Sequence, residues 1–157
     1  MVLLTMTENL RMFEALVRVE TRLWNQLDGT LSDRYGLSLA WLVALRVLQA
    51  EPGSRVQDLA EEIDISPGGA SKVVDRLVSA GLVERAADDA DRRVSRLSLT
   101  PRGRRVVQQG SKLSEEWLSE RFGQALGPHG TEDLASLLGS LAVRNDARTV
   151  PHERSHT

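Results

Sequence analysis

The stretch SRVQDLAEEIDISPGGASKVVDRLVSAGL, residues 54–82, decides the fold. Its first half repeats apolar residues with the period of a short helix that ends near Asp64: Val56, Leu59, Ala60 and Ile63. Its second half opens with Ser66, an N-cap residue, and Pro67, which suits the first helical position. A further apolar face continues this second helix as far as Gly81: Ala70, Val73, Val74 and Leu77. Two short helices joined by a tight turn predict a helix-turn-helix.

A β-hairpin is predicted directly after these two helices. The segments LVERAA (82–87) and RVSRLSLT (93–100) have the composition and alternation of strands, and the acidic residues between them favour a turn. Thr100 and Pro101 then supply the N-cap and the first residue of a long amphipathic helix. A helix-turn-helix followed by a hairpin is a winged-helix module.

More helices are predicted on both sides of this module. Two apolar stripes near the N-terminus predict a helix that ends near Gly36, and Ser38 can cap an apolar helix over 39–48. Two stripes favour two partners for the first helix, its own core and a second subunit, although a helix wholly inside one subunit is the alternative. After the module, GPHG (127–130) breaks the long helix, and Thr131 is predicted to cap a last one.

The order and spacing of three short motifs resemble the DNA-binding core of MarR-family transcription regulators: GLVER (81–85), the wing pattern Asp91-x-Arg93, and LTPRG (99–103). The resemblance implies a mainly α fold with a small β-hairpin wing, a winged helix-turn-helix core flanked by N- and C-terminal dimerisation helices. It places the DNA-binding domain at 38–100 and the helical dimerisation region at 1–36 and 101–146. The composition of the last residues predicts a flexible tail at 147–157. The resemblance also implies a homodimeric, sequence-specific transcription regulator, more often a repressor, that binds palindromic double-stranded DNA.

The second helix of the motif is the expected recognition helix, because its face opposite the apolar one is short and polar. The major groove, about 12 Å wide, admits one such helix. The residues expected to face DNA are Ser66, Pro67, Gly68, Gly69, Ser71, Lys72 and Arg76. Ser66 can cap the helix, hold a phosphate at its positive end, or do both. The two glycines either let the backbone approach DNA closely or are simply tolerated in the first turn.

Arginines at the tip of the predicted hairpin are candidates for contacts with DNA. Arg92 and Arg93 either enter a minor groove or are solvated loop charges. The resemblance assigns the minor-groove contact to Arg93 and leaves Arg92 on a phosphate, while Asp91 is expected to shape the turn and hold Arg93. Arg55 and Arg102 are candidates for phosphate contacts, which strengthen binding without specifying a sequence.

The resemblance further implies a small aromatic or phenolic anion as an effector that lowers the affinity for DNA. Aromatic and cationic residues of the first two helices could line its pocket: Arg18, Arg22, Trp24, Trp41 and Arg46. A tryptophan at helical spacing more often belongs to a core. Arg46, in an otherwise apolar helix, is expected to be buried and therefore to need a partner, either an internal carboxylate or a ligand.

The charge of the chain is unevenly distributed. The net charge is −2 over 157 residues, whereas residues 54–112 carry +2. Within that segment, residues 92–112 hold seven basic residues and no acidic one. This local basic stretch favours DNA binding more than the total charge suggests.

The composition excludes several classes of protein. No cysteine is present, so there is no thiol nucleophile and no thiolate metal site. The three histidines lie in a predicted loop and tail, and no phosphate-loop or metal-ligand spacing occurs, so we expect no enzyme, metal or cofactor. The longest apolar run, residues 39–45, is far shorter than the roughly 20 residues of a membrane-spanning helix, which favours a cytoplasmic protein.

The alternative function is a winged-helix module that binds protein instead of DNA. Such a module would expose an apolar patch in place of the cations of the recognition helix and the wing.

Overall fold

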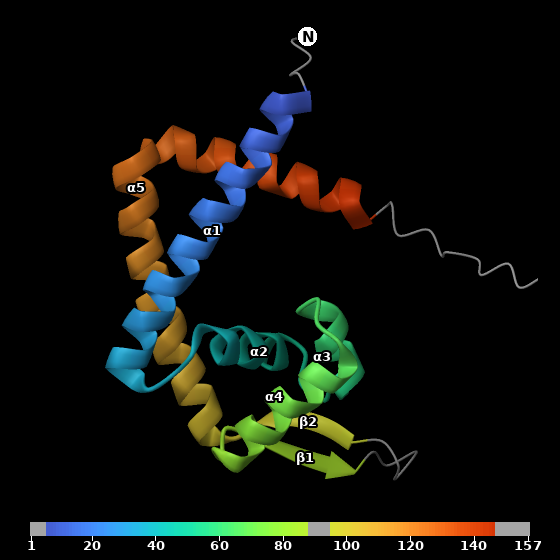
Figure 1. The fold of residues 1–157 in the computed structure, drawn as a ribbon. Helices are drawn as coiled ribbons and strands as arrows, with labels where there is room; N and C mark the ends of the chain where they lie inside the picture. The colour runs from blue at the N-terminus through green and yellow to red at the C-terminus, as the bar shows by residue number, and fades with distance from the viewer. Residues whose placement is uncertain (1–5, 88–94, 147–157) are drawn as a thin grey trace, which may run out of the picture. The chain divides into compact units, whose positions relative to one another are not determined.

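The computed structural model describes residues 6–87 and 95–146, with side chains described for 7–87 and 95–142. The elements in chain order are α1 (Met6–Tyr35), α2 (Leu39–Ala50), α3 (Val56–Glu62), α4 (Pro67–Ser79), β1 (Val83–Ala87), β2 (Ser95–Leu99) and α5 (Pro101–Asp146) (Figure 1). The predicted fold class, mainly helical with a small two-stranded hairpin, is confirmed. The chain divides into two compact units, Met1–Glu115 and Glu116–Thr157, so α5 begins in one and ends in the other.

In the first unit, α2, α3, α4 and the hairpin share one apolar core. Helix α2 contacts α1, α3, α4 and β2, which makes it the central support of the unit. It buries one stripe of leucines, because residues three apart lie on the same face of a helix. Fully buried side chains come from every element of this group: Leu42, Leu45, Leu48, Leu59, Val74, Leu77 and Leu97.

The junction between α1 and α2 is fixed by a glycine that ends α1 and by two side chains that cap α2. Helix α1 ends at Tyr35, directly before Gly36, as predicted, and the φ of +60° at Gly36 favours glycine. The Oγ atom of Ser38 accepts the N–H of Trp41 at 3.2 Å, which confirms the predicted N-cap of α2. In addition, the Asp28 carboxylate on α1 accepts the N–H of Leu39 at 2.7 Å. Asp28 therefore caps α2 from a neighbouring helix.

The helix-turn-helix has the predicted layout. Helix α3 ends at Glu62, and α4 begins at Pro67 directly after Ser66. The Ser66 Oγ accepts the N–H of Gly69 at 3.1 Å, which confirms Ser66 as the N-cap. Helices α3 and α4 contact each other, and both contact α2.

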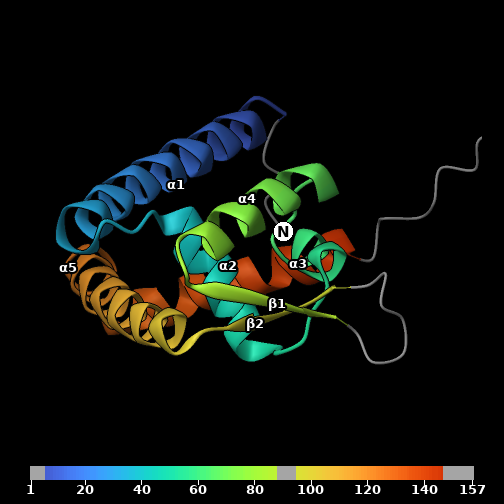
Figure 2. The ribbon, with the colours of Figure 1, turned by 90° about the horizontal axis from the view of Figure 1, so that it is seen from below.

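The hairpin lies alongside α4 in the first unit, as Figure 2 shows from below. Its two strands are antiparallel, with Val83 opposite Leu99 at the base. Val83, Leu97 and Leu99 are buried, so the base of the hairpin belongs to the core. An isolated backbone bridge joins Ser54 to Leu97 and holds β2 against the loop between α2 and α3.

The start of α5 is anchored to the turn that follows α4. The Thr100 hydroxyl oxygen accepts the N–H of Gly103 at 2.9 Å, which confirms the predicted N-cap. The same hydroxyl donates to the backbone carbonyl of Gly81 at 2.7 Å. Gly103 is buried so closely against Leu82 that a Cβ atom at position 103 would overlap the Leu82 carbonyl oxygen. The close approach of α5 to this turn therefore depends on a glycine.

In the second unit, α5 is interrupted at Gly127, whose φ of +67° is non-helical. This break was predicted from GPHG and is confirmed. The helix resumes at Pro128, however, and the Thr131 hydroxyl donates to the Gly127 carbonyl at 2.9 Å from inside the helix. The prediction of Thr131 as an N-cap is therefore wrong, because Pro128, which has no N–H, already suits the first helical position.

Candidate nucleic-acid interface

Helix α4 has one face in the core and one face exposed. The inner face consists of buried or half-buried apolar residues: Ala70, Val73, Val74 and Leu77. The outer face carries residues predicted to face DNA, of which Gly68, Lys72 and Arg76 are exposed, and Gly69 and Ser71 are half-buried. The helix thus presents short and cationic side chains on a surface that the rest of the first unit leaves uncovered.

The N-terminal turn of α4 is open to the outside. Ser66 and Pro67 are exposed, and because the Ser66 Oγ acts as an acceptor toward Gly69, its O–H can still donate to another group. A Cβ atom on Gly69 would lie 3.2 Å from Ser66 Oγ, whereas a Cβ atom on Gly68 would meet no atom within 4 Å. Packing within the chain therefore does not require glycine at position 68.

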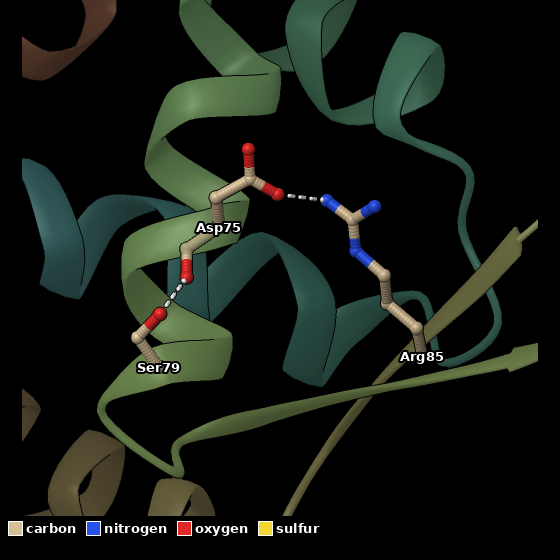
Figure 3. A network of polar contacts seen from close by, with 3 residues as sticks. All are labelled: Asp75, Ser79 and Arg85. Carbon is tan, nitrogen blue, oxygen red and sulfur yellow. Dashed lines mark hydrogen bonds and ion pairs between the residues drawn. The ribbon is translucent and has the colours of Figure 1, made fainter.

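A carboxylate also lies on the exposed side of α4. Asp75 Oδ1 accepts a hydrogen bond from Nη2 of Arg85 on β1 at 2.6 Å (Figure 3). The Ser79 hydroxyl donates to the Asp75 backbone carbonyl at 2.8 Å. The side chains of Arg85 and Asp75 are 35% and 64% exposed. The sequence prediction missed this pair. Side chains alternate along a strand, so Arg85 lies on the same face of β1 as the buried Val83. A charged residue on that face is a signal that it has a partner.

The predicted wing-tip residues Asp91, Arg92 and Arg93 lie outside the described residues, so their roles stay predictions. The described strands show how the base of the wing is held. Nη1 of Arg96, on β2, donates to the carbonyl of Gly53 at 3.0 Å. This bond ties the hairpin to the loop before α3, beside the backbone bridge described above.

The two arginines predicted to contact phosphates are both exposed. Arg55 precedes α3, where its backbone N–H donates to Asp58 Oδ2 at 2.7 Å. Arg102, in the first turn of α5, donates from Nη1 to the Ala80 carbonyl at 3.1 Å, just past the end of α4. A guanidinium has five N–H donors, so Arg102 can hold α5 against α4 and still offer donors to a phosphate.

The prediction that Arg46 is buried is wrong. Helix α2 buries the face of Leu42, Leu45 and Leu48, and Arg46 lies on another face and is exposed. There it borders a hollow of about 350 Å³ between α2 and α3, whose other lining residues are Val43, Val47, Ala50, Glu51, Glu62 and Ile63. An apolar surface with one guanidinium and two carboxylates is therefore open on this side.

The other effector candidates lie apart from this hollow. Arg18, Arg22 and Trp24 are exposed along α1, and Trp41 is half-buried on α2. None of these four residues lines the hollow beside Arg46. Of the five candidates, this hollow therefore contains Arg46 alone.

Helix α1 packs against the first unit by its last turns, where Leu27 and Leu31 are 4% and 0% exposed. Both of its predicted apolar stripes are otherwise open, with exposed side chains at Leu10, Met12, Phe13, Leu16, Val17, Val19 and Trp24. In the second unit, α5 also exposes apolar side chains: Leu126, Leu137, Leu138 and Leu141. Contiguous exposed apolar surface of this kind marks contact with another molecule.

Residues 6–87 and 95–146 contain neither a membrane-spanning helix nor a cluster of metal-ligating side chains. None of the helices there combines the length and the apolar character that crossing a membrane requires. No three acidic or histidine side chains gather there in a group able to hold a metal ion.

Known sequences and structures resemble this chain over most of its length. Residues 35–94 match the sequence model of the MarR family. The HTH-type transcriptional repressor Rv2887 of Mycobacterium tuberculosis is 33% identical over 98 residues, which are 62% of this chain and 70% of that relative.

Two solved structures have the same fold. The transcriptional repressor CouR, bound to a 23-mer DNA duplex, matches with a TM-score of 0.79 and 27% identity over 90% of this chain and 99% of that one. BpsR of Bordetella bronchiseptica, whose DNA binding is regulated by 6-hydroxynicotinic acid, matches with a TM-score of 0.73 and 26% identity. The match covers 82% of this chain and 91% of that one. Together with the helix-turn-helix, the hairpin and the exposed face of α4, these matches show that the chain belongs to the MarR family of DNA-binding winged-helix transcription regulators.

Proposed function

We propose that this protein is a homodimeric repressor that binds a two-fold symmetric DNA site and binds it less tightly when a small ligand is present. The observation that carries the proposal is the exposed, short and cationic face of α4 beside the hairpin. A relative of the same fold is a repressor bound to a DNA duplex, and another relative is a repressor by name.

Helix α4 is the proposed recognition helix. Lys72 and Arg76 lie one turn apart on its exposed face, so both can reach the same stretch of a major groove. The hydroxyl of Ser66 and the N–H of Gly68 in the first turn can hold a phosphate at the positive end of the helix. Pro67, Gly68, Gly69 and Ser71 keep this end of the helix narrow, which favours close approach of its backbone to DNA.

The wing is proposed to supply a second contact. Arg93 would enter the minor groove, where the negative potential attracts a guanidinium, while Asp91 holds Arg93 and Arg92 contacts a phosphate. Arg55 and Arg102 are proposed phosphate contacts, and their exposure supports that role. Phosphate contacts add affinity for any DNA, so sequence preference would depend on α4 and Arg93.

Dimerisation is proposed to cover the exposed apolar side chains of α1 and α5. Phe13 is 60% exposed and Leu137 is 64% exposed in the single chain, a costly arrangement for large apolar groups in water. We therefore propose residues 1–36 and 101–146 as the dimerisation region and 38–100 as the DNA-binding domain. The predicted tail, 147–157, lies outside the described residues. A two-fold dimer carries two copies of α4, which matches a two-fold symmetric DNA site.

A small aromatic acid is the proposed ligand that lowers DNA affinity. Regulation of BpsR by 6-hydroxynicotinic acid supports an acid of this class. The hollow beside Arg46, about 350 Å³, lies within the range of roughly 300–1,000 Å³ typical of small-molecule sites. A guanidinium next to apolar side chains suits an aromatic carboxylate, while the two glutamates of the hollow oppose it. Arg18, Arg22, Trp24 and Trp41 remain candidates for a pocket completed by the second subunit.

The protein is proposed to act without catalysing a reaction and without a cofactor. Its relatives are transcription regulators, which supports this part of the proposal. The proposed place of action is the cytoplasm.

Sequencing the genomic DNA that the purified protein retains tests the proposal. We expect the recovered fragments to share an inverted repeat and their gel shift to weaken steeply with added salt, because phosphate contacts release counterions. The Lys72→Ala, Arg76→Ala double variant should lose this retention. Arg34→Gln, which also removes a positive charge but lies at the end of α1, should keep it. A protein that prefers no fragment and instead captures another protein through α4 would establish the alternative, a winged-helix interaction module.

A further inference from the structure

Arg85 is a charged, exposed residue on the face of β1 that carries a buried valine. Side chains alternate along a strand, so Arg85 shares a face with Val83, which is 2% exposed. Its partner across the hairpin is Leu97, which is 0% exposed. The guanidinium leaves this apolar surface toward α4, where Nη2 donates to Asp75 Oδ1 at 2.6 Å (Figure 3).

Asp75 places a negative charge on the side of α4 that would face DNA. It lies near Lys72 and Arg76 in the sequence of the helix, and its side chain is 64% exposed. A carboxylate at such a place repels phosphates unless a cation neutralises it. Arg85 provides that cation from a different element of the fold.

The ion pair joins the two elements that the proposed function brings to DNA. Beyond Val83, the other residues of β1 are exposed: Glu84, Arg85, Ala86 and Ala87. The base of the hairpin is therefore held by the core, while the side chains of β1 beyond Val83 are not buried. The bond from Arg85 to Asp75 supplies a contact at this point.

We propose that Arg85 is a positioning residue for DNA recognition, which acts through Asp75 to hold the wing at a fixed place relative to α4. The inference rests on the proposed function and adds two residues to it that need not touch a base. Both elements then meet one DNA site at a fixed spacing, so less binding free energy is lost in arranging them. The pair then contributes to the preference for a specific site more than to the affinity for any DNA.

Asp75→Asn separates positioning from simple charge effects. The change removes a negative charge from the DNA-facing surface, so charge alone predicts tighter binding to all DNA. Loss of positioning predicts weaker binding to the specific site. We therefore expect Asp75→Asn to bind a random duplex as well as the wild type or better, yet to bind the recovered genomic fragment less tightly.

The experiment measures the affinity for that genomic fragment and for a shuffled duplex of the same length, at one salt concentration. Asp75→Asn and Arg85→Gln should each reduce the ratio of the two affinities by up to about fivefold, the contribution of an exposed ion pair. The double variant should lose no more than either single variant, because both changes break one interaction. Arg85→Lys, which can still pair with Asp75, should retain part of the ratio. Thermal unfolding of each variant should stay close to that of the wild type.

Glu84→Gln is the matched control. It removes one negative charge from β1, as Asp75→Asn does from α4, but it leaves the ion pair intact. This variant should keep the wild-type ratio of the two affinities.

Three results would overturn the inference. Equal tightening of both duplexes by Asp75→Asn would make Asp75 a repulsive charge only. Equal weakening of both duplexes by Arg85→Gln would make Arg85 an ordinary phosphate contact. A wild-type protein that prefers no genomic fragment would refute the proposed function itself, and the positioning role with it.

Discussion

Gly103 lies against the backbone carbonyl of Leu82, in a contact that leaves no room for a Cβ atom. Gly103→Ala must therefore push α5 away from the turn after α4. We expect a loss of about 1–3 kcal/mol in the free energy of unfolding, the usual cost of overpacking a buried site. Urea unfolding followed by circular dichroism measures this loss.

Gly123→Ala is the control for that variant in the same helix. Gly123 is exposed, and a Cβ atom there would meet no atom within 4 Å. Alanine should stabilise this position by up to about 1 kcal/mol, because glycine is the poorer helix former. Opposite signs for the two glycines are expected, and equal stability of Gly103→Ala and the wild type would disprove the tight contact.

Asp28 is expected to stabilise the fold through a single hydrogen bond to another helix. Its carboxylate accepts the N–H of Leu39, the first residue of α2, at 2.7 Å. Asp28→Ala should cost about 1 kcal/mol, as the loss of an N-cap typically does. Asp33→Ala, on the exposed side of α1, should change the free energy of unfolding much less. If the two variants unfold at the same urea concentration, Asp28 is not a cap.

Several ends of the elements were predictable because the deciding contact is local. Ser66 bonds the backbone three residues ahead of it, and so does Thr100. Gly36 ends α1 by its own backbone conformation. Such signals lie within a few residues of sequence, so spacing and residue type identify them. The exposed polar face of α4 was predictable for the same reason, since it lies opposite the apolar period of one helix.

The partners in contacts between separate elements were not predictable from one sequence. Asp28 reaches the start of another helix, and Asp75 meets Arg85 from a strand. The exposure of Arg46 was not predictable for the same reason. Its apolar neighbours indicate that α2 is largely buried, but they do not show which face of the helix stays exposed. A pocket for the proposed ligand would depend on such contacts, so the sequence could not show which of the candidate residues lie together.

Arg93→Ala tests the wing. If Arg93 enters a minor groove, its loss should weaken binding to the genomic fragment by about 1 kcal/mol or more, with little change in stability, because the proposed contact is made with DNA. Titration of the labelled fragment measures the affinity, and thermal unfolding confirms that the variant is folded. Arg34→Gln again controls for the loss of one positive charge. An unchanged affinity in a folded Arg93→Ala protein would refute its role in the wing.

Phe13→Asp tests whether the exposed face of α1 forms the dimer. Phe13 is 60% exposed in the single chain, and its burial between two copies would contribute about 1.5–3 kcal/mol for each copy. A carboxylate at this position would have to be buried without a partner, so we expect a monomer by light scattering at concentrations where the wild type is a dimer. Asn25→Asp adds the same charge at an exposed polar position of α1 and should remain a dimer. The monomeric variant should also bind the inverted repeat far more weakly than the wild type, because it can hold only one half-site at a time. A dimer that survives Phe13→Asp would place the interface elsewhere, and a monomeric wild type would remove the dimer and the two-fold symmetric DNA site together.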